Sequence, residues 1–309
     1  MAFRTRFWGF LAFFAVVPLT GCLFRSRIVE RQVSTAPLKT ATQAELIDYI
    51  DDQAAKIHSM QATVDIDASS GGEKKGRITD YQEIRGYVLA RKPAMLRMIG
   101  LLPIVRNKAF DMVSDGKNFK LWIPPKNRFV EGRNDVINPN AKQPLENLRP
   151  QHIYDALLLR DIDPQNEIAI MQGDVELVNG AKGRKYEQPD YAVEVLRKSD
   201  RGWYLSRKII FSRTDLLPHR QIVYDQDGNP ATDSRYEAYK EYSGVRFPSQ
   251  IEIKRPQEEY DITLNIVKLQ LNEALTNDQF QLEQLPGADV VNLDKPQTSQ
   301  IGANREEAK

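Results

Sequence analysis

The sequence predicts a mainly β protein of the α+β class, in which one amphipathic helix precedes an antiparallel sheet. Three observations support this class. Apolar residues alternate with polar ones from Ala62 onward, as at Val64 and Ile66 within 63–68. Turn signals such as Asp115-Gly116 and Asp227-Gly228-Asn229 separate the alternating stretches. The stretches lie roughly 10 to 15 residues apart, which favours an antiparallel meander over βαβ units.

The first 21 residues have the zones of a secretory signal peptide. Arg4 and Arg6 are their only charges, and an apolar run of about ten residues follows from Trp8 to Val17. This run is too short to cross roughly 30 Å of hydrocarbon as a helix. We therefore expect residues 1–21 to direct export and then to be removed.

Leu19-Thr20-Gly21-Cys22 resembles a lipobox, the sequence at which bacterial lipoproteins are lipidated and cleaved. The resemblance implies that Cys22, the only cysteine, carries acyl chains such as palmitate and becomes the mature N-terminus. Two or more acyl chains anchor a protein stably to a membrane. Leu23 follows the cysteine where an aspartate often retains a lipoprotein at the inner membrane, which favours the periplasmic side of the outer membrane. The alternative is a short membrane anchor, or an ordinary signal peptide with a chance cysteine.

The composition argues against nucleic-acid binding. The formal net charge is +1, and removal of residues 1–21 takes away Arg4 and Arg6 and changes it to −1. Charges of both signs are interspersed, so no basic surface is expected. No later apolar stretch is long enough for a transmembrane helix.

The mature chain begins with a lipidated N-terminus and a flexible tether, predicted over 22–41 because this stretch is polar and lacks apolar periodicity. A helix is predicted over 42–57. Thr42 and Glu45 have the spacing of a capping box, and five apolar residues share one face of this helix. These residues are Leu46, Ile47, Ile50, Ala54 and Ile57.

One domain, 42–292, is predicted to contain the strands, although two smaller domains are the alternative. The predicted strands are 63–68, 81–90, 110–113, 119–123, 128–130, 167–171, 174–178, 191–197, 203–212, 220–224, 233–242, 249–254 and 260–269. Residues 132–166 interrupt this series with many Asn and Pro residues and contain a short helix near 152–158. The polar tail, 293–309, is predicted to be disordered.

The apolar segment 95–105 has two interpretations. It forms a strand and turn in the core, or its residues 99–103 form an exposed apolar loop. Gly100 and Pro103 favour a turn, which would place Leu101 and Leu102 at the tip. In the second interpretation Ile99, Leu101 and Leu102 contact a membrane or the lipid of a partner, because an exposed apolar tip needs a function.

The residue pattern gives little support for an enzyme. His58, His152 and His219 are scattered, and none has the spacing of a metal site. The sequence also lacks a Gly-x-Ser-x-Gly nucleophile elbow and a phosphate-binding loop. We therefore predict no catalytic residues, no metal and no cofactor. A hydrolase with converging carboxylates is kept as the weakest alternative.

Four short patterns beyond the tether occur in the order found in one family. They are Ala90-Arg91-Lys92-Pro93-Ala94-Met95-Leu96-Arg97; Ser114-Asp115-Gly116-Lys117-Asn118-Phe119-Lys120-Leu121-Trp122; Gly244-Val245-Arg246-Phe247-Pro248; and Phe280-x-Leu282 with Leu285-Pro286-Gly287-Ala288-Asp289-Val290. With the helix before them, these patterns resemble the LolA/LolB-like superfamily of envelope lipoprotein carriers and sensors. The resemblance spans about residues 43–292.

The resemblance implies a curved, half-open antiparallel β-barrel of about 10–11 strands, with short helices covering its concave side. It also implies an apolar cavity that binds lipid or the acyl chains of lipoproteins, without catalysis, in transport to the outer membrane. The expected partners are lipid, an acylated protein, the membrane through Cys22, and an envelope protein. The alternative function is a sensor of envelope stress, or an assembly scaffold, that binds protein partners.

Overall fold

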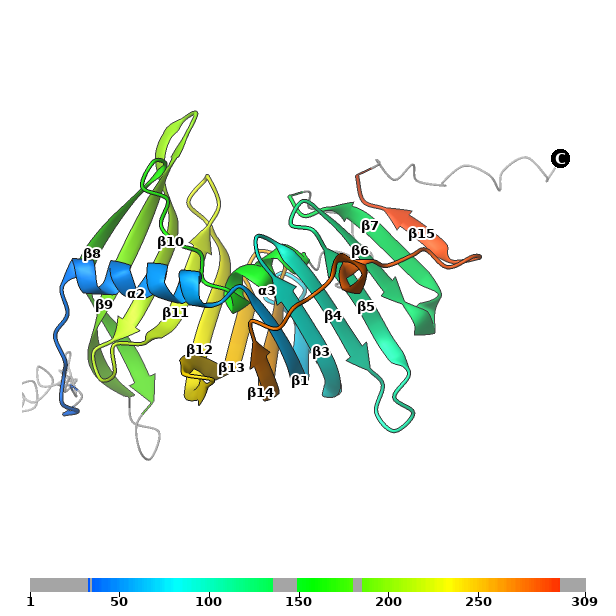
Figure 1. Ribbon diagram of the computed structural model, residues 1–309, viewed down its shortest axis with the longest axis horizontal. Helices are drawn as coiled ribbons and strands as arrows, with labels where there is room; N and C mark the ends of the chain where they lie inside the picture. The colour runs from blue at the N-terminus through cyan, green and yellow to red at the C-terminus, as the bar shows by residue number, and fades with distance from the viewer. Residues whose placement is uncertain (1–32, 34, 136–148, 180–184, 295–309) are drawn as a thin grey trace, which may run out of the picture. The chain divides into compact units, whose positions relative to one another are not determined.

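The computed structural model describes residues 33, 35–135, 149–179 and 185–294 (Figure 1). The predicted signal peptide, Cys22 and most of the predicted polar tail lie outside these residues, so the predictions made for them are not tested. The chain divides into two compact units.

The smaller unit contains residues 1–35 and 176–188. Its described residues include an isolated parallel bridge between Val33 and Glu187. The larger unit contains residues 36–175 and 189–309 and holds the two helices and nearly all of the sheet.

The elements have the following bounds: α2 (Gln43–Lys56), β1 (Ser59–Gly72), β2 (Arg77–Asp80), β3 (Ile84–Arg91), β4 (Met95–Leu101), β5 (Lys108–Ser114), β6 (Asn118–Ile123), η2 (Pro124–Lys126), β7 (Arg128–Arg133), α3 (Pro150–Leu157), β8 (Glu167–Asn179), β9 (Lys185–Ser199), β10 (Gly202–Ser212), β11 (Pro218–Tyr224), β12 (Pro230–Tyr242), β13 (Val245–Arg255), β14 (Tyr260–Leu271), η5 (Asn277–Phe280) and β15 (Asp289–Asn292). Neither helix in the described part of the chain is long and apolar enough to cross a membrane.

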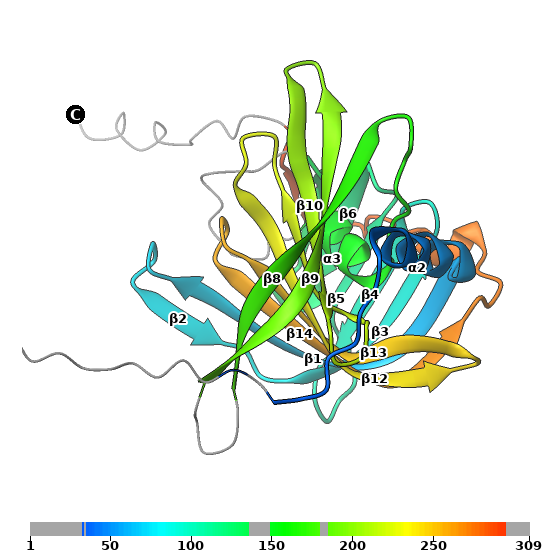
Figure 2. The ribbon, with the colours of Figure 1, turned by 90° about the vertical axis from the view of Figure 1, so that its left-hand side faces the viewer.

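The strands form one sheet in the order β15-β7-β6-β5-β4-β3-β1-β14-β13-β12-β11-β10-β9-β8, and β2 pairs with β1. The order has two ends, so the sheet does not close. Within the larger unit, strands of this sheet lie on both sides of α3 (Figure 2). The predicted fold class, a half-open antiparallel sheet with short helices, is confirmed. One pairing is parallel, between β15 and β7.

The expected numbers of strands, thirteen from the alternation and about 10–11 from the resemblance, are too low, because the sheet in the described residues has fifteen. The strands β2 and β15 contain only four residues each, and all four residues of β2 are exposed, so the sequence shows no alternation there. The apolar segment at Met95–Leu101 is the complete strand β4. In the other direction, the two strands predicted within 167–178 are a single strand, β8.

The helix α2 begins where the capping box predicts. The side chain of Thr42 accepts a hydrogen bond from the backbone N–H of Glu45, and the Glu45 carboxylate accepts one from the backbone N–H of Thr42. The buried side chains of Leu46 and Ile50 then pack against β9 and β10. Four strand residues form the other side of this contact: Val193, Val195, Ile209 and Phe211.

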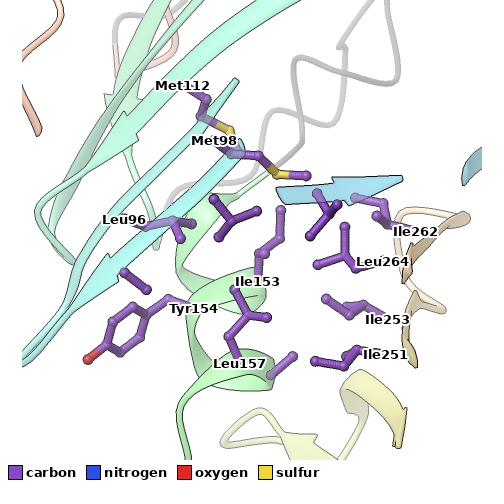
Figure 3. Close-up of a cluster of buried hydrophobic side chains, with 14 of the residues drawn as sticks. Leu96, Met98, Met112, Ile153, Tyr154, Leu157, Ile251, Ile253, Ile262 and Leu264 are labelled. Atoms are coloured by element: carbon purple, nitrogen blue, oxygen red, sulfur yellow. The ribbon is translucent and has the colours of Figure 1, made fainter. Parts of the chain in front are cut away.

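The helix α3 fills the centre of the main hydrophobic core. Pro150 occupies its first turn, where a missing N–H costs nothing. Figure 3 shows Ile153 and Leu157 pointing from α3 into a cluster of strand side chains. This cluster includes Leu96, Met98 and Met112 on one side of the helix and Ile251, Ile253, Ile262 and Leu264 on the other. The short helix predicted near 152–158 is therefore confirmed, displaced by one or two residues.

Residue pairing defines one face of the sheet, which we call the inner face. Residues directly opposite each other in neighbouring strands share a face. One row across the sheet consists of Val193, Ile209, Gln221, Ser234, Ile253, Ile262 and Ala68. A second consists of Ala62, Val88, Met98, Met112, Leu121, Val130 and Val291. The buried members of these rows, with α2 and α3, form the core on this face.

Ion pairs occupy the opposite, outer face. Arg85 pairs with Asp65 at 2.8 Å between Nε and Oδ1, and the Lys208 Nζ lies 2.8 Å from Asp174 Oδ2. These pairs are partly exposed, so each contributes little stability, about 0–1 kcal/mol. Residues of this kind are the polar members of the alternating apolar and polar pattern that predicts the strands.

Candidate functional site

An apolar cavity of about 290 Å³ lies on the inner face of β1, β3 and β14, where these strands meet the turn between β4 and β5. It is lined by Ile66, Ala68, Ser69, Ser70, Tyr81, Gln82, Ile84, Leu102, Pro103, Ala109, Phe110, Tyr260, Asp261 and Ile262. Asp261 is the only charged member of this lining. We call this space the apolar cavity.

Two glycines opposite each other in β3 and β4 help to form the wall of the apolar cavity. Gly86 pairs with Gly100. A Cβ atom on Gly100 would lie 2.4 Å from Cε1 of Phe110 and 2.7 Å from Cδ1 of Ile84. A Cβ atom on Gly86 would lie 2.5 Å from Cδ1 of Ile66. The glycines thus let three lining side chains lie directly against the backbone of the sheet.

An apolar turn lies beside the apolar cavity. The backbone N–H of Arg106 donates to the carbonyl of Leu102 at 3.0 Å, and Ile104 and Arg106 have φ values of 67° and 54°. Ile104 is 98% exposed and Val105 is 63% exposed, whereas the preceding Leu102 and Pro103 line the cavity. These two adjacent apolar side chains are exposed to water at the edge of the apolar cavity.

The predicted position of the loop tip, at Leu101 and Leu102, is wrong. Ile99 lies within β4, where it pairs with Tyr87 and Asp111. Leu101 is the last residue of that strand, and both it and Leu102 are only half-exposed. The turn begins late because Gly100 stays in the ladder between Gly86 and Phe110. Contact of Ile99, Leu101 and Leu102 with lipid stays a prediction.

A second hairpin lies at the other side of the apolar cavity. Tyr81 lines the cavity and is 43% exposed, and its hydroxyl lies 3.1 Å from Oγ of Ser70. Gly71 makes the hairpin between β1 and β2 possible, because its φ is +107° and an added Cβ would lie 2.0 Å from the carbonyl oxygen of Arg77. Ile78 in β2 is 66% exposed.

The histidines do not gather into a site. Burial and the charges of Arg255 and Arg149 lower the pKa of His152 to about 3, so its imidazole is neutral and weakly basic. His219 Nε2 lies 3.5 Å from Asp215 Oδ1 on another part of the sheet. Within the described residues, no three His, Cys, Asp or Glu side chains are placed to hold a metal ion.

The sequence did not identify most of the cavity residues. Phe110, Tyr260 and Ile262 read as ordinary strand residues, since any inward position in a strand has the same alternation. One signal was available for the turn, because the apolar pair Ile104-Val105 directly follows Pro103.

Three comparisons place the chain among known proteins. A family model described as an uncharacterized protein matches residues 174–286. No curated protein sequence matches the chain. Among solved structures, a LolA superfamily protein from Nitrosomonas europaea is 13% identical with a TM-score of 0.47, and the match covers 80% of this chain and 100% of that one.

Two further structures are similar to the chain. An outer membrane lipoprotein-sorting protein domain from Vibrio parahaemolyticus is 13% identical with a TM-score of 0.46, and the match covers 76% of this chain and 94% of that one. A complex of MucA and MucB from Pseudomonas aeruginosa matches at 12% identity and a TM-score of 0.24, over 77% of this chain and 61% of that one.

Proposed function

We propose that this chain is an envelope lipoprotein that binds the acyl chain of a lipid or of an acylated protein in the apolar cavity, without catalysis. The cavity itself carries this proposal. Its volume of about 290 Å³ lies near the lower end of the range of ligand sites, roughly 300–1,000 Å³. Ten of the fourteen residues that line it are aliphatic or aromatic, and the other four are Ser69, Ser70, Gln82 and Asp261.

The cavity must offset the free-energy cost of moving an acyl chain out of a bilayer. Removing a 16-carbon chain from a bilayer costs on the order of 12 kcal/mol, at about 0.8 kcal/mol per methylene. Contacts with Ile66, Phe110 and Ile262 would offset part of this cost. The rest of the acyl chain would lie across Ile104 and Val105, whose exposed side chains continue the apolar surface.

An anchor on Cys22 fits this role. A chain tethered to the membrane receives or holds an acylated ligand at that membrane, whereas a shuttling carrier must leave it. The proposed location is the outer membrane, facing the periplasm, as the lipobox resemblance and Leu23 imply.

Filling the apolar cavity is expected to weaken binding strongly. Ala68 lies on the inner face opposite Ile262, and its replacement by Trp puts an indole into the cavity. In the mature chain carrying Cys22→Ser, we expect Ala68→Trp to weaken binding of a fluorescent fatty acid at least about tenfold, since an acyl segment loses about 0.8 kcal/mol for each methylene left in water. Ala44→Trp, on an exposed position of α2, is the control and should bind normally. Equal affinity in the two variants would contradict the proposal.

A non-catalytic sensor or scaffold that binds protein partners is the second candidate, favoured by the exposed side chains of Ile104 and Val105. The double variant Ile104→Asp/Val105→Asp separates the two functions. If the protein binds lipid, we expect this variant to take up lipid more slowly from phospholipid vesicles, because charged side chains at the turn oppose contact with the bilayer. Its affinity for a soluble fatty acid should be unchanged. Native mass spectrometry and stopped-flow fluorescence measure both. A chain that takes up no lipid even before substitution would favour the sensor or scaffold.

A further inference from the structure

A second cavity on the inner face has a very different lining. It also has a volume of about 290 Å³, and it lies between α3 and the strands β9, β10 and β11. Three arginines line it, Arg160, Arg197 and Arg207, together with Asp155 and Tyr204. We call it the arginine cavity. Five strand spacings of about 4.8 Å separate β10 from β1 along the sheet, so the two cavities are separate sites.

One buried carboxylate holds the three arginines together. Glu167, at the start of β8, has a fully buried side chain. Its Oε1 lies 2.7 Å from Nη2 of Arg160 and 3.1 Å from Nε of Arg197, and its Oε2 lies 3.4 Å from Nη2 of Arg207. The carboxylate therefore fixes three guanidinium groups around one point.

Arg207 forms the rigid base of this arrangement. Its side chain is 4% exposed, and it also donates from Nη1 to the carbonyl of Arg160 at 2.5 Å and from Nη2 to the carbonyl of Asp161 at 2.6 Å. These bonds hold the loop that carries Arg160 against β10.

Arg160 and Arg197 keep donors for a ligand. Their side chains are 43% and 37% exposed. Within the described part of the chain, Arg160 donates only to Glu167 and Arg197 is in an ion pair with Glu167 alone, which leaves the other N–H groups of both guanidinium groups directed to no protein acceptor. A guanidinium presents its N–H groups in a planar fork that matches a carboxylate or a phosphate.

The charges of the wall favour an anion. The lining contains three arginine side chains and one carboxylate, that of Asp155. Glu167, which is buried outside the lining, compensates one more of the three positive charges, so a net positive charge remains. Asp161 and Asp163 lie in the adjoining loop. The Asp163 carboxylate is engaged by the backbone N–H of Gln165 at 2.9 Å and by Asn166.

We propose that the arginine cavity binds a small anionic group, a phosphate or a carboxylate, through the free N–H groups of Arg160 and Arg197. Arg207 and Glu167 hold the two arginines in place. Tyr204 also lines the cavity. This site does not depend on acyl binding in the apolar cavity, so either proposal can fail without the other.

Asp155 makes this binding depend on pH. It lies on α3, accepts a hydrogen bond from Gln151 at 2.8 Å, and faces Arg160, Arg207 and the phenol of Tyr236. Burial raises the pKa of Asp155 to about 6, although Gln151 and the two arginines oppose the shift. Above that pH the ionised carboxylate repels a bound anion, and below it the repulsion is gone.

Sulfate tests the site, because it stays doubly charged from pH 5 to pH 8. In isothermal titration calorimetry at constant ionic strength, we expect the mature chain to bind one sulfate. Because the pKa of Asp155 is about 6, binding should be up to about tenfold tighter at pH 5 than at pH 7. Arg197→Gln should weaken binding at least about tenfold, since it removes a charge-assisted hydrogen bond. Asp155→Asn should keep sulfate binding and remove most of its pH dependence.

Two controls complete the experiment. Arg201→Gln removes an arginine that is 80% exposed and paired with Asp227, and it should leave sulfate binding unchanged. Arg160→Gln is the second site variant if Arg197→Gln does not fold, as judged by thermal unfolding. Absence of saturable sulfate binding, or equal affinity in the wild type and a folded site variant, would overturn the proposal.

A second titration distinguishes a lipid headgroup from a free anion as the ligand. Inorganic phosphate and a short-chain phosphatidic acid present the same group. A lipid headgroup is the ligand if the phosphatidic acid binds at least about tenfold more tightly and Arg197→Gln removes that advantage. A free anion is the ligand if the two bind equally and both respond to the substitution.

Discussion

Replacing Glu167 by glutamine is expected to lower the free energy of unfolding by about 3 to 5 kcal/mol, the range for breaking a buried ion pair from one side. The Glu167 side chain is fully buried, and Arg207, which is 4% exposed, cannot turn to solvent when the carboxylate is lost. The backbone N–H of Asp163 also donates to Oε2 at 3.2 Å. A neutral amide no longer compensates the charges of the three arginines that Glu167 pairs with. Chemical denaturation at pH 7 measures the change.

The matched control is Asp227→Asn. Asp227 and Arg201 form an exposed pair, with 3.5 Å between Oδ1 and Nη1. Its loss should cost no more than about 0.5 kcal/mol, as is usual for a surface pair. A Glu167→Gln variant that loses less than about 1 kcal/mol would mean that water already stabilises these arginines, and the description of Arg207 as a rigid base would then be wrong.

Replacement of Cys22 by alanine is expected to abolish acylation completely. The sulfur of Cys22 is the only atom to which the lipobox resemblance assigns a thioether-linked lipid, and the chain has no second cysteine. Metabolic labelling with radioactive palmitate should mark the wild-type chain and leave Cys22→Ala unlabelled. The mass of the mature N-terminus should also show cleavage before residue 22 in the wild type alone.

The position of the anchor has its own control. Leu23→Ala changes the neighbouring residue without removing the sulfur, so it should be labelled like the wild type. Labelled palmitate in Cys22→Ala, or an unlabelled wild-type chain with an intact N-terminal segment, would contradict the lipoprotein assignment. A tether built from two or more acyl chains is stable, at about 0.8 kcal/mol per buried methylene.

Local sequence signals predicted the parts of the fold that depend on neighbours in the chain. The capping box at Thr42 and Glu45 marks the true start of α2. Asp115-Gly116 joins β5 to β6, and Asp227-Gly228 lies in the turn between β11 and β12. Each of these signals works through contacts within a few residues, so the surrounding fold does not change its meaning.

The parts that were missed depend on partners far away in the chain. The pattern that ends at Val290 resembles a closing strand of the family, but it does not show the partner of this strand. Asp289–Asn292 pairs in parallel with residues 128–131, and four residues alone do not reveal such a partner. The turn beside the apolar cavity starts late because Gly86 holds Gly100 in the ladder. From the sequence alone, a glycine within a strand is easily taken for a turn residue, because the residue that pairs with it on the neighbouring strand is not known.

The candidate sites were even less visible in the sequence. The apolar cavity combines strands from both ends of the domain, β3 and β14, through the central strand β1. The arginine cavity gathers Arg160, Arg197 and Arg207 around Glu167, and the spacing of these residues has no period. Charges of both signs are common in this chain, so only the register of β8 to β11 shows which of them meet.

The central place of β1 has a consequence for how the chain reaches its native state. Synthesis delivers β1 early, and β3 can pair with one of its edges at once. The other edge must wait about 200 residues for β14, since Met60 pairs with Leu271. During this interval the unpaired edge of a long strand carries inward apolar residues such as Val64 and Ile66, the kind of surface on which partly folded chains aggregate or exchange strands. The middle of the sheet can therefore form only after β14 has been synthesised, and a chaperone that shields this edge of β1 would act before that pairing.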